Sequence, residues 1–140
     1  MNPTLECTDV VIRYEEKGET ILSGIRLSLA PGERVALVGQ NGAGKTSLLL
    51  ALVGLVPFEG TVAVCGDLLS ARTVKRVRRN VGFVFNVPED QLLFPTALED
   101  VSFGLLRRGV QREEAFTEAG EAVGRLGIEH IANKPLHHLS

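Results

Sequence analysis

The chain has 140 residues, of which 44% are hydrophobic, and its fifteen basic and seventeen acidic side chains give a net charge of −2. This length suits one compact domain, and the near-balanced charge provides no general field toward nucleic acid or anionic lipid. The longest apolar stretch, 48–56, is less than half of the roughly twenty residues that a membrane-spanning helix needs, and the N-terminus lacks a secretory signal pattern. We therefore expect a cytoplasmic chain that meets a membrane only through a partner.

The first part of the chain predicts two strands, 5–14 and 20–29, joined by a charged turn. Apolar and polar residues alternate in the second strand, as expected where one face is buried. Cys7 and Cys65 lie among strand-like residues, so we expect two small core residues rather than a disulfide.

A nearly all-apolar segment, 34–38, is typical of a strand buried on both faces of a parallel sheet. A glycine-rich loop follows it directly, and then a helix is expected over 45–54, ended by Gly54 and Pro57. Further along the chain we expect strands over 60–64 and 81–85, with a basic helix over 72–79 between them. This order of strands and helices indicates an α/β fold.

The last third of the sequence predicts helices. Thr96 and Glu99 form a capping-box pattern, and Leu98, Val101 and Leu105 fall on one face of the helix that it opens. A second helix is indicated by Phe116, Ala119, Val123 and Leu126, at spacings of three, four and three. We therefore divide the chain into a β-rich portion with the glycine-rich loop, 1–95, and a helical subdomain, 96–140.

The glycine-rich loop carries the strongest functional signal, because it matches the P-loop (Walker A) pattern Gly-x-x-x-x-Gly-Lys-Thr. Glycines at 39, 42 and 44 let the backbone wrap closely around phosphates, and the following helix adds its positive N-terminal end. Lys45 is expected to reach the β- and γ-phosphates, as candidate catalytic residue, and Thr46 to bind Mg²⁺. The alternative is a strand-to-helix turn with an exposed lysine. The candidate nucleotide-binding residues of the loop are Gly39, Gln40, Asn41, Gly42, Ala43, Gly44, Lys45, Thr46 and Ser47.

The surroundings of this loop resemble an ATP-binding cassette (ABC) transporter ATPase. Tyr14 stands about twenty-five residues before the loop, where cassette ATPases carry an aromatic residue that stacks on adenine; the alternative is an ordinary strand tyrosine. The segment 81–92 looks like the cassette Q-loop. Its sequence Pro-Glu-Asp-Gln at 88–91 is similar to that of the energy-coupling-factor and cobalt-importer ATPases. The resemblance implies ATP and Mg²⁺ as ligands. It also implies a P-loop NTPase cassette core with an N-terminal antiparallel β portion and a helical subdomain.

One position departs from the family pattern. The Q-loop of the family begins with a glutamine that meets Mg²⁺ and the attacking water, whereas this chain has Asn86. Asparagine keeps the carboxamide but is one methylene shorter, so its oxygen falls short by roughly 1.5 Å. The resemblance makes Asn86 a candidate Mg²⁺ ligand beside Thr46, and its shorter reach argues against direct contact. The alternative is a turn asparagine two residues before Pro88.

The segment 134–140 resembles the residues that lead into the cassette signature Leu-Ser-Gly-Gly-Gln, and it stops after the first two residues of that signature. His137 and His138 are adjacent and no further Cys or His cluster accompanies them, which disfavours a metal site there. No apolar strand ending in Asp-Glu follows the helical segment, and no downstream switch histidine is present. We therefore expect an N-terminal portion of a longer ATPase, with an incomplete sheet, some exposed apolar surface and no ATP turnover by this chain alone.

The resemblance implies an ATP-binding subunit of an importer for a metal ion or a vitamin. Such a subunit pairs with a second ABC ATPase subunit, identical or different, and with an integral membrane transport subunit at the inner face of the plasma membrane. Two alternatives stay open: a soluble ABC protein that acts on DNA or the ribosome, and a nucleotide-binding fragment without turnover. The basic helix at 72–79 has no interleaved aromatic residues, so we expect a solvated helix face and no nucleic-acid partner.

Overall fold

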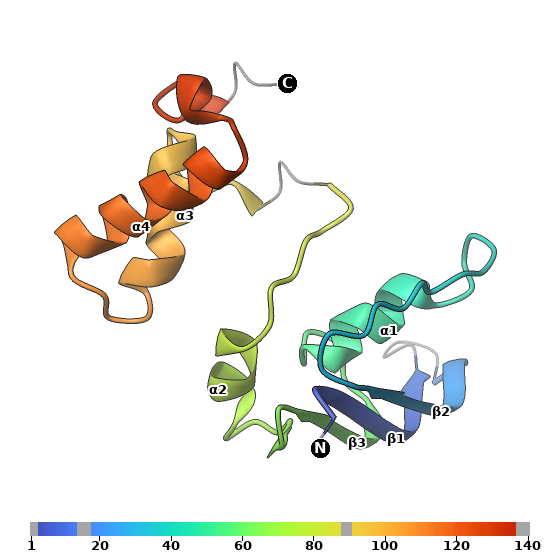
Figure 1. The fold of residues 1–140 in the computed structure, drawn as a ribbon. Helices are drawn as coiled ribbons and strands as arrows, with labels where there is room; N and C mark the ends of the chain where they lie inside the picture. Colours follow the sequence, from blue (N-terminus) through green and yellow to red (C-terminus); the bar gives the residue numbers. More distant parts are fainter. Residues whose placement is uncertain (1–2, 14–17, 88–90, 137–140) are drawn as a thin grey trace. The chain divides into compact units, whose positions relative to one another are not determined.

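The computed structural model describes residues 3–13, 18–87 and 91–136. The chain divides into two compact units, 1–82 and 83–140. The first unit contains β1 (Leu5–Arg13), β2 (Thr20–Leu29), α1 (Lys45–Leu52), β3 (Glu59–Val64), β4 (Asp67–Leu68) and α2 (Val74–Arg79). The second contains α3 (Ala97–Leu106), α4 (Arg112–Arg125) and a 3-10 turn, η2 (Glu129–Ile131) (Figure 1).

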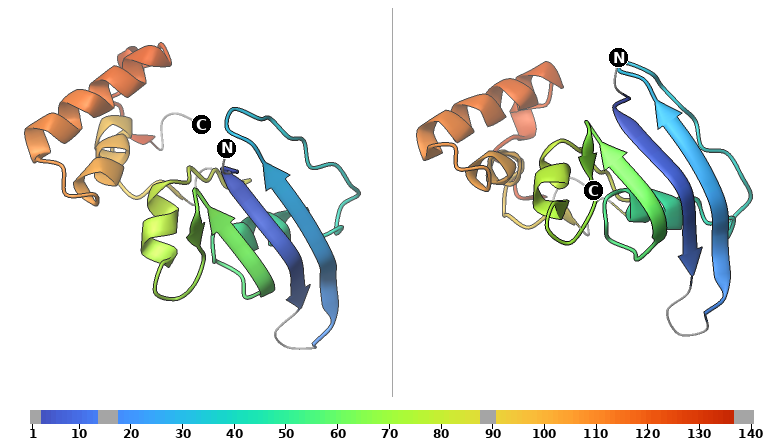
Figure 2. Two further views of the ribbon diagram at one scale, coloured as in Figure 1. Left: turned by 60° about the horizontal axis from the view of Figure 1, so that its bottom comes forward. Right: turned by 90° about the horizontal axis from the view of Figure 1, so that it is seen from below.

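The first unit is built on a four-stranded antiparallel sheet with the order β2-β1-β3-β4. Helix α1 lies across one face of this sheet (Figure 2). Buried residues of β1, α1 and β3 form the core between them: Cys7, Val10, Ile12, Leu48, Ala51, Leu52 and Val62. The predicted strands 5–14 and 20–29 and the predicted helix after the glycine-rich loop are thus confirmed within one or two residues at the ends that the structure describes.

Two predicted strands are wrong. Neither 34–38 nor 81–85 forms a strand, and Val38 and Val84 are 88% and 83% exposed. Their apolar character favours a buried sheet, but a strand exists only where a neighbour supplies hydrogen-bond partners. No described strand pairs with either segment. The exposed apolar surface that the sequence predicts is therefore present at these two segments.

The prediction for the cysteines is half right. Cys7 is buried in the core, whereas Cys65 is exposed. Val64 pairs with Asp67, so Cys65 and Gly66 form a two-residue hairpin turn in which both residues have positive φ (50° and 84°). A turn of this kind projects Cys65 into solvent, although its sequence neighbours are strand residues.

The exposure difference predicts different thiol reactivity. We expect iodoacetamide to alkylate Cys65 in the folded chain and to leave Cys7 unmodified, because Cys7 is 2% exposed and its burial raises the pKa of its thiol. Mass spectrometry of the labelled peptides measures this. In urea both thiols should react; equal labelling of the folded chain would contradict the burial of Cys7.

The second unit begins its helices as predicted. The Thr96 hydroxyl accepts a hydrogen bond from the Glu99 N–H (3.3 Å), and the Glu99 carboxylate accepts one from the Thr96 N–H (3.2 Å), which confirms the capping box. The predicted buried faces are confirmed only in part. Ala119 and Val123 are buried as predicted, whereas Val101 and Leu126 are exposed; Ser102 and Ala115 are buried although they were not predicted. Ser102 tolerates burial because its hydroxyl donates to the Glu99 carbonyl at 2.8 Å.

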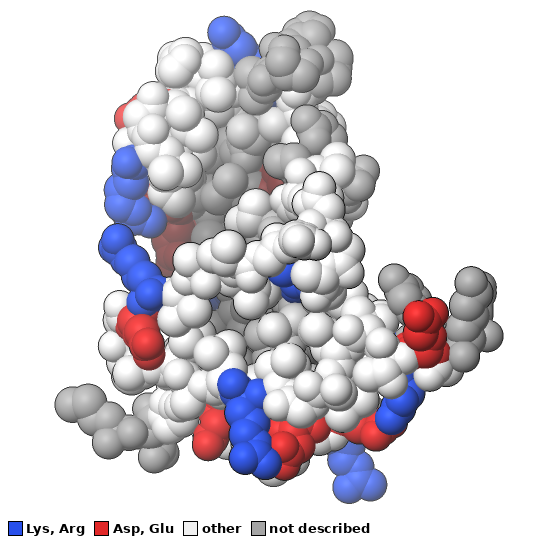
Figure 3. Space-filling view, turned by 90° about the vertical axis from the view of Figure 1, so that its right-hand side faces the viewer, with Lys and Arg blue, Asp and Glu red and all other residues white. Residues whose placement is uncertain are grey.

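Exposed charged residues of both signs occur among the described residues. On the face drawn in Figure 3, Lys and Arg side chains lie beside Asp and Glu side chains, without a broad area of one sign. In the basic helix α2, Arg76 forms two hydrogen bonds with Asp67 (2.8 and 2.6 Å), which hold the pKa of that carboxyl below its usual value. The basic face of α2 is therefore not simply solvated in the way that the sequence predicts, because Arg76 and Arg78 form hydrogen bonds with other parts of the first unit.

Within the three described stretches, no helix is both long and apolar enough to cross a membrane.

Candidate nucleotide-binding site

The P-loop connects the unpaired segment 34–38 to helix α1, which begins at Lys45. Gly44 is the N-cap of this helix and has a φ of 85°, in the left-handed region that favours glycine. A Cβ on Gly44 would also lie 2.9 Å from Cγ of Leu22 in β2. The requirement for glycine at this position therefore has two causes, the backbone conformation and the closeness of β2.

The N-terminus of α1 is suited to an anion. No side chain caps it, and no acidic residue lies in its first turn. The first hydrogen bond of the helix runs from the Leu48 N–H to the Gly44 carbonyl (2.9 Å). The N–H groups of the first turn point along the helix axis at its positive end, where a phosphate is stabilised.

A cavity of about 280 Å³ lies at this helix end, lined by Ile21 and by the loop residues 41–47. The structure thus brings most of the predicted loop residues around one hollow. Ile21 was missed by the sequence analysis, because its contribution depends on β2 packing beside the loop. The only local signal for it is an apolar position at the start of a strand.

The Lys45 ammonium lies within the loop itself. Its Nζ donates to the carbonyls of Gly39 and Gln40, both at 2.8 Å. These two bonds hold the positive charge next to the cavity, on the side chain predicted to meet the phosphates. Gly39 and Gln40 therefore hold the Lys45 side chain through their carbonyls. Residues 41–47 line the cavity.

The structure does not test the remaining candidates. Asn86 is exposed and belongs to the second unit, so its role as a Mg²⁺ ligand stays a prediction. The Gln91 carboxamide, when its nitrogen faces the Phe83 carbonyl (3.3 Å), also accepts from the Phe85 N–H (3.1 Å). Tyr14, His137 and His138 lie outside the described residues. Among the residues that are described, no group of three or more His, Cys, Asp or Glu could hold a metal ion.

Comparison with known proteins identifies the family. Residues 22–140 match the family described as ABC transporter. The chain belongs to the ABC transporter family. This confirms the resemblance found in the sequence and the fold class inferred from it, an α/β P-loop cassette with an antiparallel β portion, a helical subdomain and an incomplete sheet.

Relatives within the ABC family include energy-coupling-factor proteins. An energy-coupling factor transporter ATP-binding protein EcfA from Methanosphaera stadtmanae is 40% identical over 143 residues, which cover 100% of this chain and 51% of that protein. A putative ABC transporter ATP-binding protein from Brucella suis biovar 1 is 38% identical, covering 100% of this chain and 58% of that protein. The chain thus spans between half and three fifths of the length of these relatives.

Two solved ABC structures are similar to the chain as a whole. The structure of cbiO1 from Clostridium perfringens, part of the ABC transporter complex cbiONQ, has a TM-score of 0.85 at 29% identity and covers 100% of this chain and 57% of that one. A dimeric ATP-binding cassette in a post-hydrolysis state, bound to ADP and Pi, has a TM-score of 0.81 at 28% identity over 97% of this chain and 63% of that one. The similarity to energy-coupling-factor ATPases, first suggested by Pro-Glu-Asp-Gln at 88–91, is therefore confirmed.

Proposed function

We propose that the chain binds MgATP at the P-loop as the ATP-binding part of an ABC importer subunit for a metal ion or a vitamin. The observation that carries this proposal is the loop 39–47, which wraps around the uncapped N-terminus of α1 and holds the Lys45 ammonium beside a cavity. Its family membership and its relatives named EcfA support the nucleotide and the transport role.

Each loop residue has a role that its chemistry suits. The first-turn N–H groups of α1 and the Lys45 ammonium would bind the phosphate oxygens, which carry the negative charge of ATP. The exposed Thr46 hydroxyl is a hard oxygen ligand of the kind that Mg²⁺ accepts beside substrate phosphates. When bound, Mg²⁺ neutralises charge on the β- and γ-phosphates. Tyr14 as an adenine contact and Asn86 as a second metal ligand complete the proposed site.

ATP hydrolysis by the family requires groups from two cassettes, so the proposal includes partners. We infer a second ABC ATPase subunit, identical or different, and an integral membrane subunit driven by nucleotide-dependent closure of the pair. The solved relative described as dimeric and the relative that is part of the complex cbiONQ support these two partners. The chain would then lie at the cytoplasmic face of the membrane without spanning it.

The test is a calorimetric titration of the chain with ATP in the presence of Mg²⁺ and, separately, with EDTA. We expect Mg²⁺ to strengthen ATP binding, and we expect Thr46→Ala to weaken the Mg²⁺-dependent binding by about tenfold, the loss of roughly one contact to a charged group. Thr117→Ala is the matched control, since Thr117 lies on α4 and its hydroxyl donates only to its own helix at Glu113. Absence of ATP binding by the unmodified chain would refute the proposed function.

A further inference from the structure

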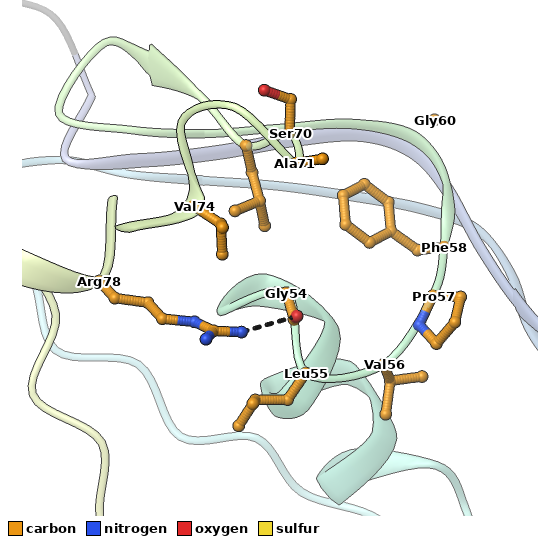
Figure 4. A pocket seen from close by; sticks show the side chains of 11 residues that line it. Gly54, Leu55, Val56, Pro57, Phe58, Gly60, Ser70, Ala71, Val74 and Arg78 are labelled. Carbon is orange, nitrogen blue, oxygen red and sulfur yellow. Dashed lines mark hydrogen bonds between the residues drawn. The ribbon is translucent and has the colours of Figure 1, made fainter. Parts of the chain in front are cut away.

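Helix α2 reaches the C-terminal end of α1 through two side chains, Val74 and Arg78: Val74 packs beside Gly54, and Arg78 makes the hydrogen bonds. The Arg78 Nε donates to the Val53 carbonyl at 2.8 Å. Its Nη2 donates to the Gly54 carbonyl, also at 2.8 Å (Figure 4). Helix α1 ends at Leu52 and has no basic residue in its last turn. The positive charge at the negative end of the α1 dipole therefore comes from another helix.

Arg78 also borders a hollow at this end of α1. A cavity of about 620 Å³ lies between the end of α1, the turn before β3 and the start of α2. Leu55, Phe58 and Val74 line it together with Arg78 (Figure 4). At this position a guanidinium fixes both distance and direction, because its planar fork donates to two acceptors at once.

Of the two helices that Arg78 joins, one begins at the proposed nucleotide site and the other lies next to the boundary between the units in the sequence. Helix α1 carries Lys45 and Thr46 at its beginning, and it has only eight residues, so its two ends are about 12 Å apart. Helix α2 ends at Arg79, and the first unit ends at Gly82. The Arg78 contacts therefore connect the nucleotide-binding helix to the last helix before the boundary between the units.

We propose that Arg78 is a positioning residue that couples MgATP binding at the P-loop to the order of α2 and of the boundary segment 80–82. The inference rests on the proposed function. A phosphate would bind the free N–H groups at the start of α1, and the Arg78 guanidinium binds the carbonyls at its end. Both sets of groups are correctly placed only while α1 is an ordered helix, so both ligands favour the ordered state. Two groups that favour the same state strengthen each other's binding, and the coupling is reciprocal.

The experiment is hydrogen exchange by mass spectrometry on the full chain, with and without MgATP. Ligand binding slows exchange wherever opening prevents binding, by up to about a hundredfold at a ligand concentration of about 100 Kd. The reporters are N–H groups whose partners are known: Leu48 in α1, and Val77 and Asn80, which donate to Thr73 and Val77 carbonyls. We expect MgATP to protect both groups of reporters in the unmodified chain.

Arg78→Met should separate the two groups of reporters. Protection of Leu48 should persist, protection of Val77 and Asn80 should disappear, and the Kd for MgATP should rise about fivefold, the lower range of typical coupling. Arg78→Lys is the second variant, for use if Arg78→Met does not fold. Lysine keeps the positive charge but cannot donate to both carbonyls with a planar guanidinium, so we expect MgATP to protect Val77 and Asn80 less than in the unmodified chain and more than in Arg78→Met. Arg76→Met is the matched control, because it removes one charge and two hydrogen bonds from α2 but cuts the link to Asp67 instead of α1.

The outcomes distinguish the two proposals. If MgATP protects Leu48 but not α2 in the unmodified chain, or if Arg78→Met leaves the protection of α2 intact, the role of Arg78 is refuted while nucleotide binding stands. Equal loss in Arg76→Met would show a general loosening of α2 and would also refute it. If MgATP fails to protect Leu48 in the unmodified chain, the proposed function itself fails.

Discussion

Replacing Lys45 with alanine is expected to raise the Kd for MgATP by about a hundredfold, because contacts to charged phosphate oxygens worth roughly 3 kcal/mol are lost. The ammonium already lies at the loop, where it donates to the Gly39 and Gln40 carbonyls at 2.8 Å. It can turn toward phosphates without a large movement of the backbone. Isothermal titration of both chains with MgATP measures the change.

The folding of the Lys45→Ala variant should be almost unaffected. Its two lost acceptors belong to exposed loop residues, which water can satisfy, so we expect a change in the free energy of unfolding below about 1 kcal/mol. Lys75→Ala is the matched control, because Lys75 is an exposed lysine of α2 away from the loop. Unchanged MgATP affinity in Lys45→Ala, or equal losses in both variants, would show that the P-loop lysine is not a phosphate ligand here.

The P-loop could be predicted from the sequence because its chemistry is contiguous. Glycines, lysine and threonine stand within nine residues, and a local turn followed by a helix is enough to gather them. The same holds for the capping box at Thr96 and for the alternating pattern of β2. In each case the partner groups are within a few residues of one another.

The wrong predictions concern features that depend on distant partners. The apolar segments 34–38 and 81–85 have strand composition, but pairing decides whether a strand forms, and no described strand pairs with them. Arg78 contacts the end of α1 at residues that are 24 and 25 positions away in the sequence, so no local sequence pattern predicts this contact. Cys65 shows the opposite case, where a local hairpin overrides strand-like neighbours.

Gly60→Ala is expected to destabilise the first unit by about 3 kcal/mol or more, the sum of left-handed backbone strain and overpacking. Gly60 has a φ of 92°, and a Cβ there would lie 2.4 Å from the Asp9 carbonyl oxygen and 2.7 Å from that of Thr8. These are backbone atoms of β1, at the point where the register between β1 and β3 is irregular. Relief of the clash would therefore require β1 and β3 to move apart, next to the core residues Val10 and Val62.

Gly66→Ala provides the control that separates strain from crowding. Gly66 has a similar φ of 84°, but a Cβ at this hairpin position would meet nothing within 4 Å. We expect this variant to lose only the backbone part, about 1–2 kcal/mol. Urea unfolding followed by circular dichroism gives both free energies. Equal destabilisation by the two substitutions would mean that β1 and β3 approach each other less closely at Gly60 than the structure shows. A clearly larger loss at Gly60 would show that β1 and β3 approach each other closely at this irregular point of their register.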